Sequence, residues 1–476
     1  MGLLAGLAIF VTFVNVLLGI TIIFLERKQV STTWAWLMVL FFIPIFGFIL
    51  YLFLGQNLSK AKLFRVSSEA TEFFTSLKKR QKKMFDHHHE SNYEYQGLMY
   101  MNLVNNDSIF SNDNHIEVFT DGHKKMDDLI REIEKAEEFI HIQYYIVRND
   151  ETGERLINAL SKKAYEGVEV RFLYDDMGSL SLRRSALSPL INAGGHVAAF
   201  FPSRIPYINL RLNYRNHRKI AVVDGVVGYI GGFNIGNEYL GLVQKFGYWR
   251  DTHLKVSGSA VYSLQTRFYL DWNHASKYKM APSSRYFPDI QPQGNSGMQI
   301  ITSGPDSEWQ QIKNAYIKLI LSAKESVYIQ TPYFIPDDSL MDAIKIASLS
   351  GVDVKIMIPN KPDHMFVYWA TYAHIGQLID AGVRSFTYEN GFLHAKTLVV
   401  DGKVASVGTA NIDVRSFKLN FEVNAIVYDP ILSNELQQIF IEDLANSYEI
   451  TEEVYRNRTN LIKMKESVSR LLSPIL

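Results

Sequence analysis

The chain has 476 residues, 47% of them hydrophobic, with 49 Lys and Arg residues against 49 Asp and Glu residues and no cysteine. Its length suffices for two to four domains with a large core, whereas its zero net charge argues against a protein that coats nucleic acid. The absence of cysteine excludes a thiol nucleophile, disulfide bonds, cysteine-ligated zinc and iron–sulfur clusters.

Two long apolar runs open the chain. Residues 3–25 and residues 34–54 carry no charged side chain, and each run has roughly the 20 residues that a membrane-spanning helix needs. Pro44 and Gly47 in the second run are compatible with a membrane helix. A cleaved signal peptide is disfavoured, because the first run is too long for one and a second run follows. We therefore predict a transmembrane hairpin over residues 1–58.

Basic residues follow the hairpin. They concentrate in residues 59–83, whereas the connection between the runs, residues 26–28, carries only two. The positive-inside rule then places the large C-terminal region on the cytoplasmic side. The cluster at residues 78–83 either lies on anionic headgroups or forms a solvated helical linker. Three consecutive histidines at residues 87–89 lack further ligands at a useful spacing, so we assign them to a linker over residues 59–110 rather than to a metal site.

The rest of the chain repeats one pattern. A short strand, a helix, a glycine and a second strand follow one another in residues 138–173 and again in residues 325–357. Such units predict an α/β fold with a largely parallel sheet. We expect two similar α/β/α halves packed together, at residues 111–285 and 286–476, with the boundary in the polar stretch of residues 282–297.

Each half contains one His-x-Lys-x4-Asp motif. The residues are His217, Lys219 and Asp224 in the first half, and His394, Lys396 and Asp401 in the second. Two copies at matching places in two repeats are a far stronger signal than one copy. Because residues i and i+2 of a strand point to the same face, each His and Lys project together toward one ligand. Each Asp precedes a Gly in a hairpin signal, so it is either a turn residue or part of the chemistry.

An asparagine follows each motif on the returning strand. Asn234 ends a Gly-Gly-x-Asn string and Asn411 ends a Gly-Thr-x-Asn string. Small residues let backbone approach a ligand, and each Asn adds an amide donor. Lys and Asn donors around a His suit a phosphate ester that is attacked by an imidazole.

These motifs are identified as those of the phospholipase D superfamily. The extended strings of residues 228–239, 249–253 and 411–422, together with the N-terminal runs, resemble bacterial cardiolipin synthases over essentially the whole chain. The resemblance implies two phospholipase D-like α/β/α repeats packed together after a two-helix transmembrane hairpin. It also implies a multi-pass protein of the bacterial cell membrane whose partners are phospholipids, phosphatidylglycerol above all, and not nucleic acid.

The same resemblance implies a phosphatidyl transfer that needs neither metal nor cofactor. One histidine attacks phosphatidylglycerol to form a phosphohistidine, and the other protonates the departing glycerol and then activates a second phosphatidylglycerol. Family precedent favours His217 as nucleophile and His394 as acid and base, although the nearly symmetric sequence does not decide. By the same analogy Asp251 and Glu422 hydrogen-bond the histidines; the alternative is that either is a surface carboxylate.

Other functions fit less well. Hydrolysis to phosphatidic acid, or transfer to a different alcohol, would use the same motifs. A nuclease is disfavoured by the neutral charge and the hairpin, and a scaffold by two intact motifs. Near the C-terminus an apolar series has helical spacing, at Leu461, Met464, Val468, Leu471 and Ile475. We expect this series to pack onto the domain, with contact to the membrane as the alternative.

Overall fold

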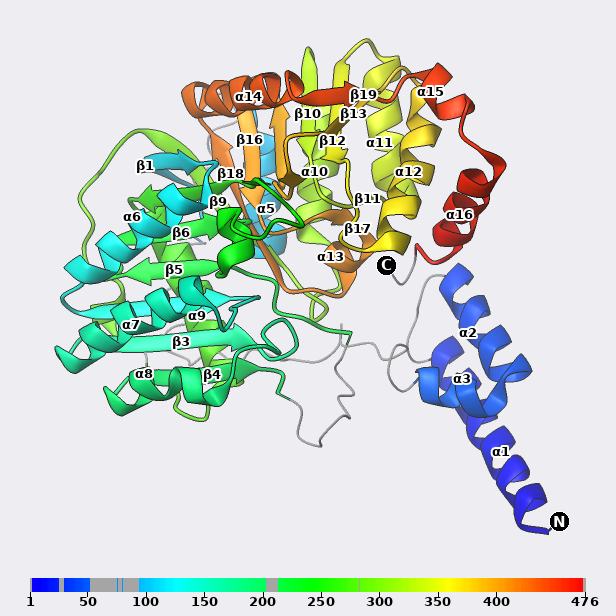
Figure 1. The fold of residues 1–476 in the computed structure, drawn as a ribbon, viewed down its shortest axis with the longest axis horizontal. Coiled ribbons are helices and arrows are strands. Elements are labelled where there is room, and N and C mark those ends of the chain that lie inside the picture. The colour runs from blue at the N-terminus through cyan, green and yellow to red at the C-terminus, as the bar shows by residue number, and fades with distance from the viewer. Residues whose placement is uncertain are drawn as a thin grey trace.

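The computed structural model describes residues 2–24, 30–51, 75, 79, 94–202, 213–281 and 283–473. It shows a two-part α/β body and a group of N-terminal helices (Figure 1). The predicted basic cluster (apart from Lys79) and the histidine run lie outside the described residues, as does most of the predicted linker. The described end of that linker forms helix α5 (Gln96–Asn106), which packs in the core of the second half through Leu98 and Met99.

One sheet of 15 strands runs through both halves of the body. The first half contributes β1 (Ser111–Phe119), β2 (Phe139–Tyr144), β3 (Glu169–Asp175), β4 (His196–Phe200), β5 (Ile220–Val223), β6 (Val227–Gly231) and β8 (His253–Ser257). The second contributes β9 (Ser296–Ser303), β10 (Ser326–Gln330), β12 (Asp353–Pro359), β13 (Arg384–Tyr388), β15 (Thr397–Val400), β16 (Val404–Gly408), β18 (Glu422–Tyr428) and β19 (Ser447–Glu449).

The strand order confirms the predicted duplication. From the edge inward, the first half runs β4-β3-β2-β5-β6-β8-β1, and the second half runs β13-β12-β10-β15-β16-β18-β9 inside its edge strand β19. The halves join where β1 pairs antiparallel with β9. Within the 15-stranded sheet, only β2, β3 and β4, and likewise β10, β12 and β13, pair in parallel. The prediction of a largely parallel sheet is therefore wrong, because the tight Asp-Gly turns return the chain in antiparallel hairpins.

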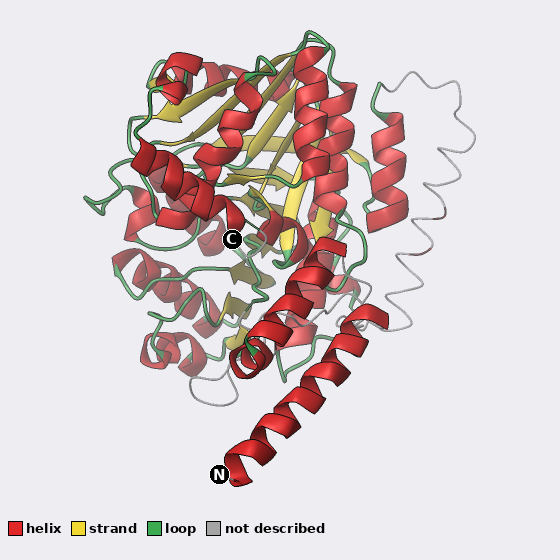
Figure 2. Cartoon of the chain, turned by 90° about the vertical axis from the view of Figure 1, so that its right-hand side faces the viewer, coloured by secondary structure: helices red, strands yellow, loops and turns green. Residues whose placement is uncertain are grey.

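Helices cover both faces of this sheet (Figure 2). The first half has α6 (Gly122–Lys135), α7 (Glu151–Tyr165), α8 (Ser188–Asn192) and α9 (Ala260–Ala275). The second has α10 (Gln311–Ser322), α11 (Asp338–Leu349), α12 (Met365–Ile379), α13 (Val414–Lys418), α14 (Pro430–Leu444), α15 (Glu452–Arg456) and α16 (Asn460–Leu471). Short elements complete the body: β7 (Trp249–Arg250), β11 (Phe334–Ile335), β14 (Phe392–Leu393), β17 (Ile412–Asp413) and the 3-10 turns Arg184–Leu187, Asn237–Leu240 and Ser284–Tyr286.

Alternate side chains along the central strands point to opposite faces of the sheet, which explains why helices cover both faces. In β5, Ile220 and Val222 pack in the cluster that contains α9, whereas Ala221 and Val223 pack in the cluster that contains α6 and α7. All four side chains are buried, as expected for a strand that is covered on both faces. The predicted glycine stops also form: Gly167 follows α7 at φ 93° and Gly351 follows α11 at φ 94°.

The N-terminal residues form three helices, α1 (Gly2–Phe24), α2 (Val30–Phe42) and α3 (Pro44–Leu50). The second predicted span is thus not one helix. Pro44 has no N–H to continue α2, and it takes the first position of α3. A Cβ on Gly47 would lie 2.7 Å from the carbonyl oxygen of Val39, so α3 turns back against α2. Within the described part of the chain, no helix combines the length and apolar character required to cross a membrane.

Candidate active site

The two predicted motifs are anchored at the junction between the halves. His217 lies just before β5, and its backbone N–H donates to the carbonyl of Phe421 in the other half at 2.9 Å. His394 lies just before β15, and its backbone N–H donates to the carbonyl of Arg250 at 2.7 Å. Short parallel pairing of β14 with β7 continues the second of these contacts. Each motif is therefore positioned by a segment of the opposite half.

The acidic partners also come from the opposite half. Nδ1 of His217 lies 2.9 Å from Oε2 of Glu422, and Nδ1 of His394 lies 2.6 Å from Oδ2 of Asp251. Both carboxylates are fully buried, so the alternative of surface carboxylates is excluded. A carboxylate on Nδ1 holds a proton at that atom and leaves Nε2 of each imidazole for chemistry.

The small residues after each motif make room for these carboxylates. A Cβ on Gly232 would lie 1.9 Å from Oδ1 of Asp251, so only glycine fits there. In the second half the equivalent residue is Thr409, whose hydroxyl donates to Glu422 at 2.6 Å. The Gly-Gly-x-Asn and Gly-Thr-x-Asn strings thus serve the histidine–carboxylate pairs as well as a ligand.

Burial controls the charge of the site. It lowers the pKa of His217 to about 4, against the opposing charge of Glu422. It also lowers the pKa of His394 to about 4, together with the nearby Lys396 and against Asp251. Burial raises the pKa of Glu422, but the charges of His217 and Lys219 outweigh it and keep the net pKa low. Burial therefore favours neutral imidazoles, and an anionic phosphodiester beside them would favour protonation.

The two motif lysines each bind the backbone carbonyl of the histidine in their own motif. Nζ of Lys219 donates to the carbonyl of His217 at 2.7 Å, and Lys396 donates likewise to the carbonyl of His394. Both are buried, and burial lowers the pKa of Lys219 to about 7 and that of Lys396 to about 8. Their charge still reaches across the site, since Lys396 acts on His217 and Lys219 acts on His394. The four motif side chains thus form one electrostatic unit.

The two asparagines differ in their contacts. Oδ1 of Asn234 accepts from the backbone N–H of Ile146 at 3.1 Å, which fixes its amide group. Nδ2 of Asn411 lies 3.3 Å from Oδ2 of Asp413, a buried residue whose pKa is raised by burial to about 6. Both asparagines are only 5% exposed. Each asparagine lies three residues past the end of its returning strand, after β6 in the first half and after β16 in the second.

The motif aspartates lie away from the imidazoles. Asp224 stands seven positions after His217, and seven steps of extended chain span about 20 Å. Its carboxylate accepts from the backbone N–H groups of residues 137, 138 and 139, each at 2.8 Å. Asp401 accepts in the same way from residues 324, 325 and 326 at 2.8–2.9 Å. Both carboxylates hold a turn against the start of a neighbouring strand, which favours the turn alternative over a part in the chemistry.

Two buried polar networks were missed by sequence reasoning. In the first, Gln143 and Arg218 both bind Asp271 of α9, at 2.7 Å each. In the second, Gln330 donates to Asp443 of α14 at 2.7 Å, and Arg250 pairs with the same carboxylate at 2.9 Å. The two glutamines stand at matching places in the repeated strands, so comparison of the repeats would have pointed to both networks.

Aromatic rings complete the walls of the site. The ring of Tyr145 lies 4.7 Å from that of His217, and the ring of Trp249 lies 5.0 Å from that of His394. No group of three or more His, Asp or Glu side chains within the described ranges is arranged to hold a metal ion.

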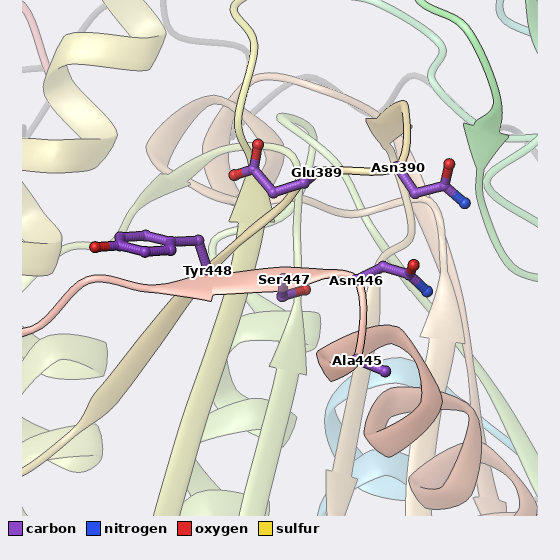
Figure 3. Close-up of a pocket in the computed structure, with 6 residues that line it drawn as sticks. All are labelled: Glu389, Asn390, Ala445, Asn446, Ser447 and Tyr448. Atoms are coloured by element: carbon purple, nitrogen blue, oxygen red, sulfur yellow. The ribbon is translucent and has the colours of Figure 1, made fainter.

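A surface hollow of the second half lies apart from the histidines. It has a volume of about 450 Å³ and is lined by Glu389, Asn390, Ala445, Asn446, Ser447 and Tyr448 (Figure 3). Its one carboxylate, Glu389, already accepts from Asn360 at 2.6 Å and from Thr387 at 2.7 Å. The histidine site, with its paired carboxylates and lysines, is therefore the candidate for chemistry.

Comparison with known proteins places this geometry in context. The family described as "Cardiolipin synthase, PLD-like domain" matches residues 129–247 and 316–444, and the family described as "Phospholipase_D-nuclease N-terminal" matches residues 13–56. The major cardiolipin synthase ClsA of Bacillus subtilis is 56% identical over 468 residues, which covers 97% of each chain. A cardiolipin synthase of Listeria monocytogenes is 54% identical over 482 residues, which covers 100% of each chain.

A solved structure shares the fold. The crystal structure of phosphatidylserine synthase from Haemophilus influenzae matches with a TM-score of 0.57, covering 76% of this chain and 95% of that chain. The two sequences are 17% identical over the match, so this likeness concerns the arrangement of the two halves and not the reaction.

Proposed function

Because the chain belongs to the cardiolipin synthase family of the phospholipase D superfamily, we propose that it transfers a phosphatidyl group reversibly between two phosphatidylglycerol molecules, giving cardiolipin and glycerol. The observation that carries this proposal is the pair of imidazoles, each with a buried carboxylate on Nδ1 and a lysine behind it. A double-displacement reaction needs one group to attack phosphorus and a second to move protons, and this site has both.

In the first step we assign the attack to Nε2 of His217. The N–P bond forms as the P–O bond to glycerol breaks, and the imidazolium of His394 donates its Nε2 proton to the leaving oxygen. Glu422 stabilises the positive charge that develops on His217. The charges of Lys219 and Lys396, with the amide of Asn234, favour the negative oxygens of the transferred phosphoryl group.

In the second step His394 is neutral and acts as the base. It takes the proton of the primary hydroxyl of a second phosphatidylglycerol, whose oxygen attacks phosphorus. The P–N bond breaks, cardiolipin leaves, and His217 returns to its neutral form while His394 is again protonated. Asp251 holds His394 in one tautomer throughout, so that Nε2 both gives and receives the proton.

The N-terminal helices supply the contact with the membrane in this proposal. Along α1, Phe10 and Phe13 are 63% and 62% exposed, and an apolar surface of this kind marks a region that another phase or partner covers. Nδ2 of Asn15 donates to the carbonyl of Leu40 at 3.2 Å, which ties α1 to α2. We assign these helices to a membrane hairpin and the body to the cytoplasmic side, where the basic residues that follow the hairpin favour it.

The first test is an analysis of products. The detergent-solubilised full chain is incubated with phosphatidylglycerol and a metal chelator, and the lipids are identified by mass spectrometry. We expect cardiolipin and glycerol, lost in His217→Ala and retained in His115→Ala, an exposed histidine outside the site. Phosphatidic acid as the sole product would contradict the proposal, because water would then be the acceptor.

A second test identifies the nucleophile. A phosphatidyl ester with a nitrophenolate leaving group needs no proton to depart, so His394→Ala should still form the phosphohistidine and release nitrophenol in a single burst. His217→Ala should release none. The reverse pattern would assign the attack to His394.

A further inference from the structure

Helix α16 exposes a row of apolar side chains, and the two side chains that it buries are polar. Leu461, Met464, Val468 and Leu471 are 57%, 58%, 51% and 77% exposed. The helix packs against α12, and its buried residues are Ser469 and Glu466, which are 1% and 3% exposed. The expectation that the apolar series packs onto the domain is therefore wrong, and its fifth member, Ile475, lies outside the described residues.

Specific contacts hold the helix in this orientation. Glu466 accepts from Arg458 at 2.8 Å, and burial raises the pKa of this carboxyl group. The ammonium group of Lys465 lies 5.3 Å from the ring of Trp369 on α12. Thr459 caps the first turn by accepting from the backbone N–H of Ile462. Rotating the helix to bury its apolar side would break the first two contacts and leave Glu466 without its partner.

We propose that the stripe formed by Leu461, Met464, Val468 and Leu471 lies in the surface of an anionic bilayer, with α16 parallel to the membrane plane. The spacing of three, four and three residues places these side chains in one row. A row of this kind, open to solvent, indicates a surface that is covered when the protein works.

The charges of α16 identify a membrane as the occupant. The helix carries Lys463, Lys465 and Arg470, and its only carboxylate, Glu466, is buried and paired with Arg458. Its outer surface is thus purely cationic around an apolar row, as in helices that lie at the boundary of headgroups and acyl chains. Phosphatidylglycerol has the complementary anionic headgroup. This contact is separate from the N-terminal helices and goes beyond the proposed reaction.

The absence of cysteine allows a direct test. Met464→Cys in the full chain carries a polarity-sensitive fluorophore, and the protein is placed in vesicles of phosphatidylglycerol and phosphatidylcholine. The emission should shift to shorter wavelength and be quenched by lipids with a spin label on the acyl chain. Tyr165→Cys is the matched control, because Tyr165 is 86% exposed at the end of α7 in the other half.

Two results would overturn the proposal. One is a fluorophore at residue 464 that is quenched no more than the fluorophore at residue 165. The other is energy transfer between labelled copies without quenching by lipid, which would assign the row to a second copy of this chain. Neither result depends on the reaction, so failure here is distinct from failure of the proposed function.

A variant then tests the consequence for turnover. Replacing all four apolar residues by serine should lower turnover on vesicles by about tenfold or more, because burial of one such side chain is worth roughly that factor in binding. Turnover on phosphatidylglycerol dispersed in detergent micelles should stay unchanged, since substrate there reaches the site without docking. Unchanged turnover on vesicles would contradict the proposal.

Discussion

Replacement of Asp401 separates a structural role from a catalytic one. In Asp401→Ala all three hydrogen bonds to the start of β10 are lost, at about 1 kcal/mol each for bonds that are partly open to solvent. Residue 401 also has a φ of 53°, where alanine costs about 1 kcal/mol more. The variant should therefore lose about 4 kcal/mol of unfolding free energy.

The unfolding free energy of Asp401→Asn should lie between that of the parent and that of Asp401→Ala. Oδ1 accepts from residues 325 and 326, and asparagine keeps this oxygen and tolerates a positive φ. Only the bond from residue 324 to Oδ2 is lost, so the expected cost is about 1 kcal/mol. Asp224 makes the same three bonds in the first half and should show the same order of effects.

The assay combines unfolding with turnover. Thermal unfolding of the solubilised full chain is followed by circular dichroism, and Asp401→Ala should unfold roughly 10 °C lower than the parent. At low temperature, turnover per folded molecule of Asp401→Asn should lie within about a factor of two of the parent, since no reacting group is changed. A variant that unfolds like the parent yet loses turnover would refute this reasoning and return Asp401 to the chemistry.

Two further predictions concern the histidines. Glu422→Gln removes the charge that opposes the lowering of the pKa of His217, so the acid limb of the kcat/KM profile should move to lower pH; an unmoved limb would show that Glu422 does not set this pKa. Burial lowers the pKa of His217 and His394 from 6.5 to about 4, so the unfolded chain binds more protons between these values, and stability present above pH 6.5 should be lost as pH falls to 4, by about 3 kcal/mol for each histidine. Denaturant unfolding across this pH range should show that the unfolding free energy of the double variant His217→Asn/His394→Asn depends less steeply on pH than that of the parent. An equal slope in parent and variant would argue against buried neutral imidazoles.

Much of this architecture follows from local sequence signals. Glycines 167 and 351 ended helices as predicted, and Asp-Gly turns closed the hairpins that carry each motif. Both histidines could be found because repetition made a weak motif specific. These features depend on a few neighbouring residues, and such patterns are legible in one sequence.

Features that depend on how distant parts of the chain pack together were not predictable from the sequence. Nothing near His217 in the sequence indicates that its carboxylate comes from residue 422, because that pairing arises only when the halves join. The orientation of α16 was missed for a related reason: periodicity identifies the apolar face but does not show which face meets the domain. The break at Pro44 was missed because membrane helices often tolerate proline, whereas here α3 turns back on α2.

The crossed pairing of histidines and carboxylates has a consequence during synthesis of the chain. When the ribosome has completed the first half, His217 is present but Glu422 lies some 200 residues ahead, and Asp251 has no histidine to hold. An incomplete chain therefore has neither imidazole–carboxylate pair before residue 394 has emerged, and it does not have both pairs before residue 422 has emerged. The same holds for a proteolytic fragment of either half. Both pairs of the candidate site thus exist only in a chain that contains both halves.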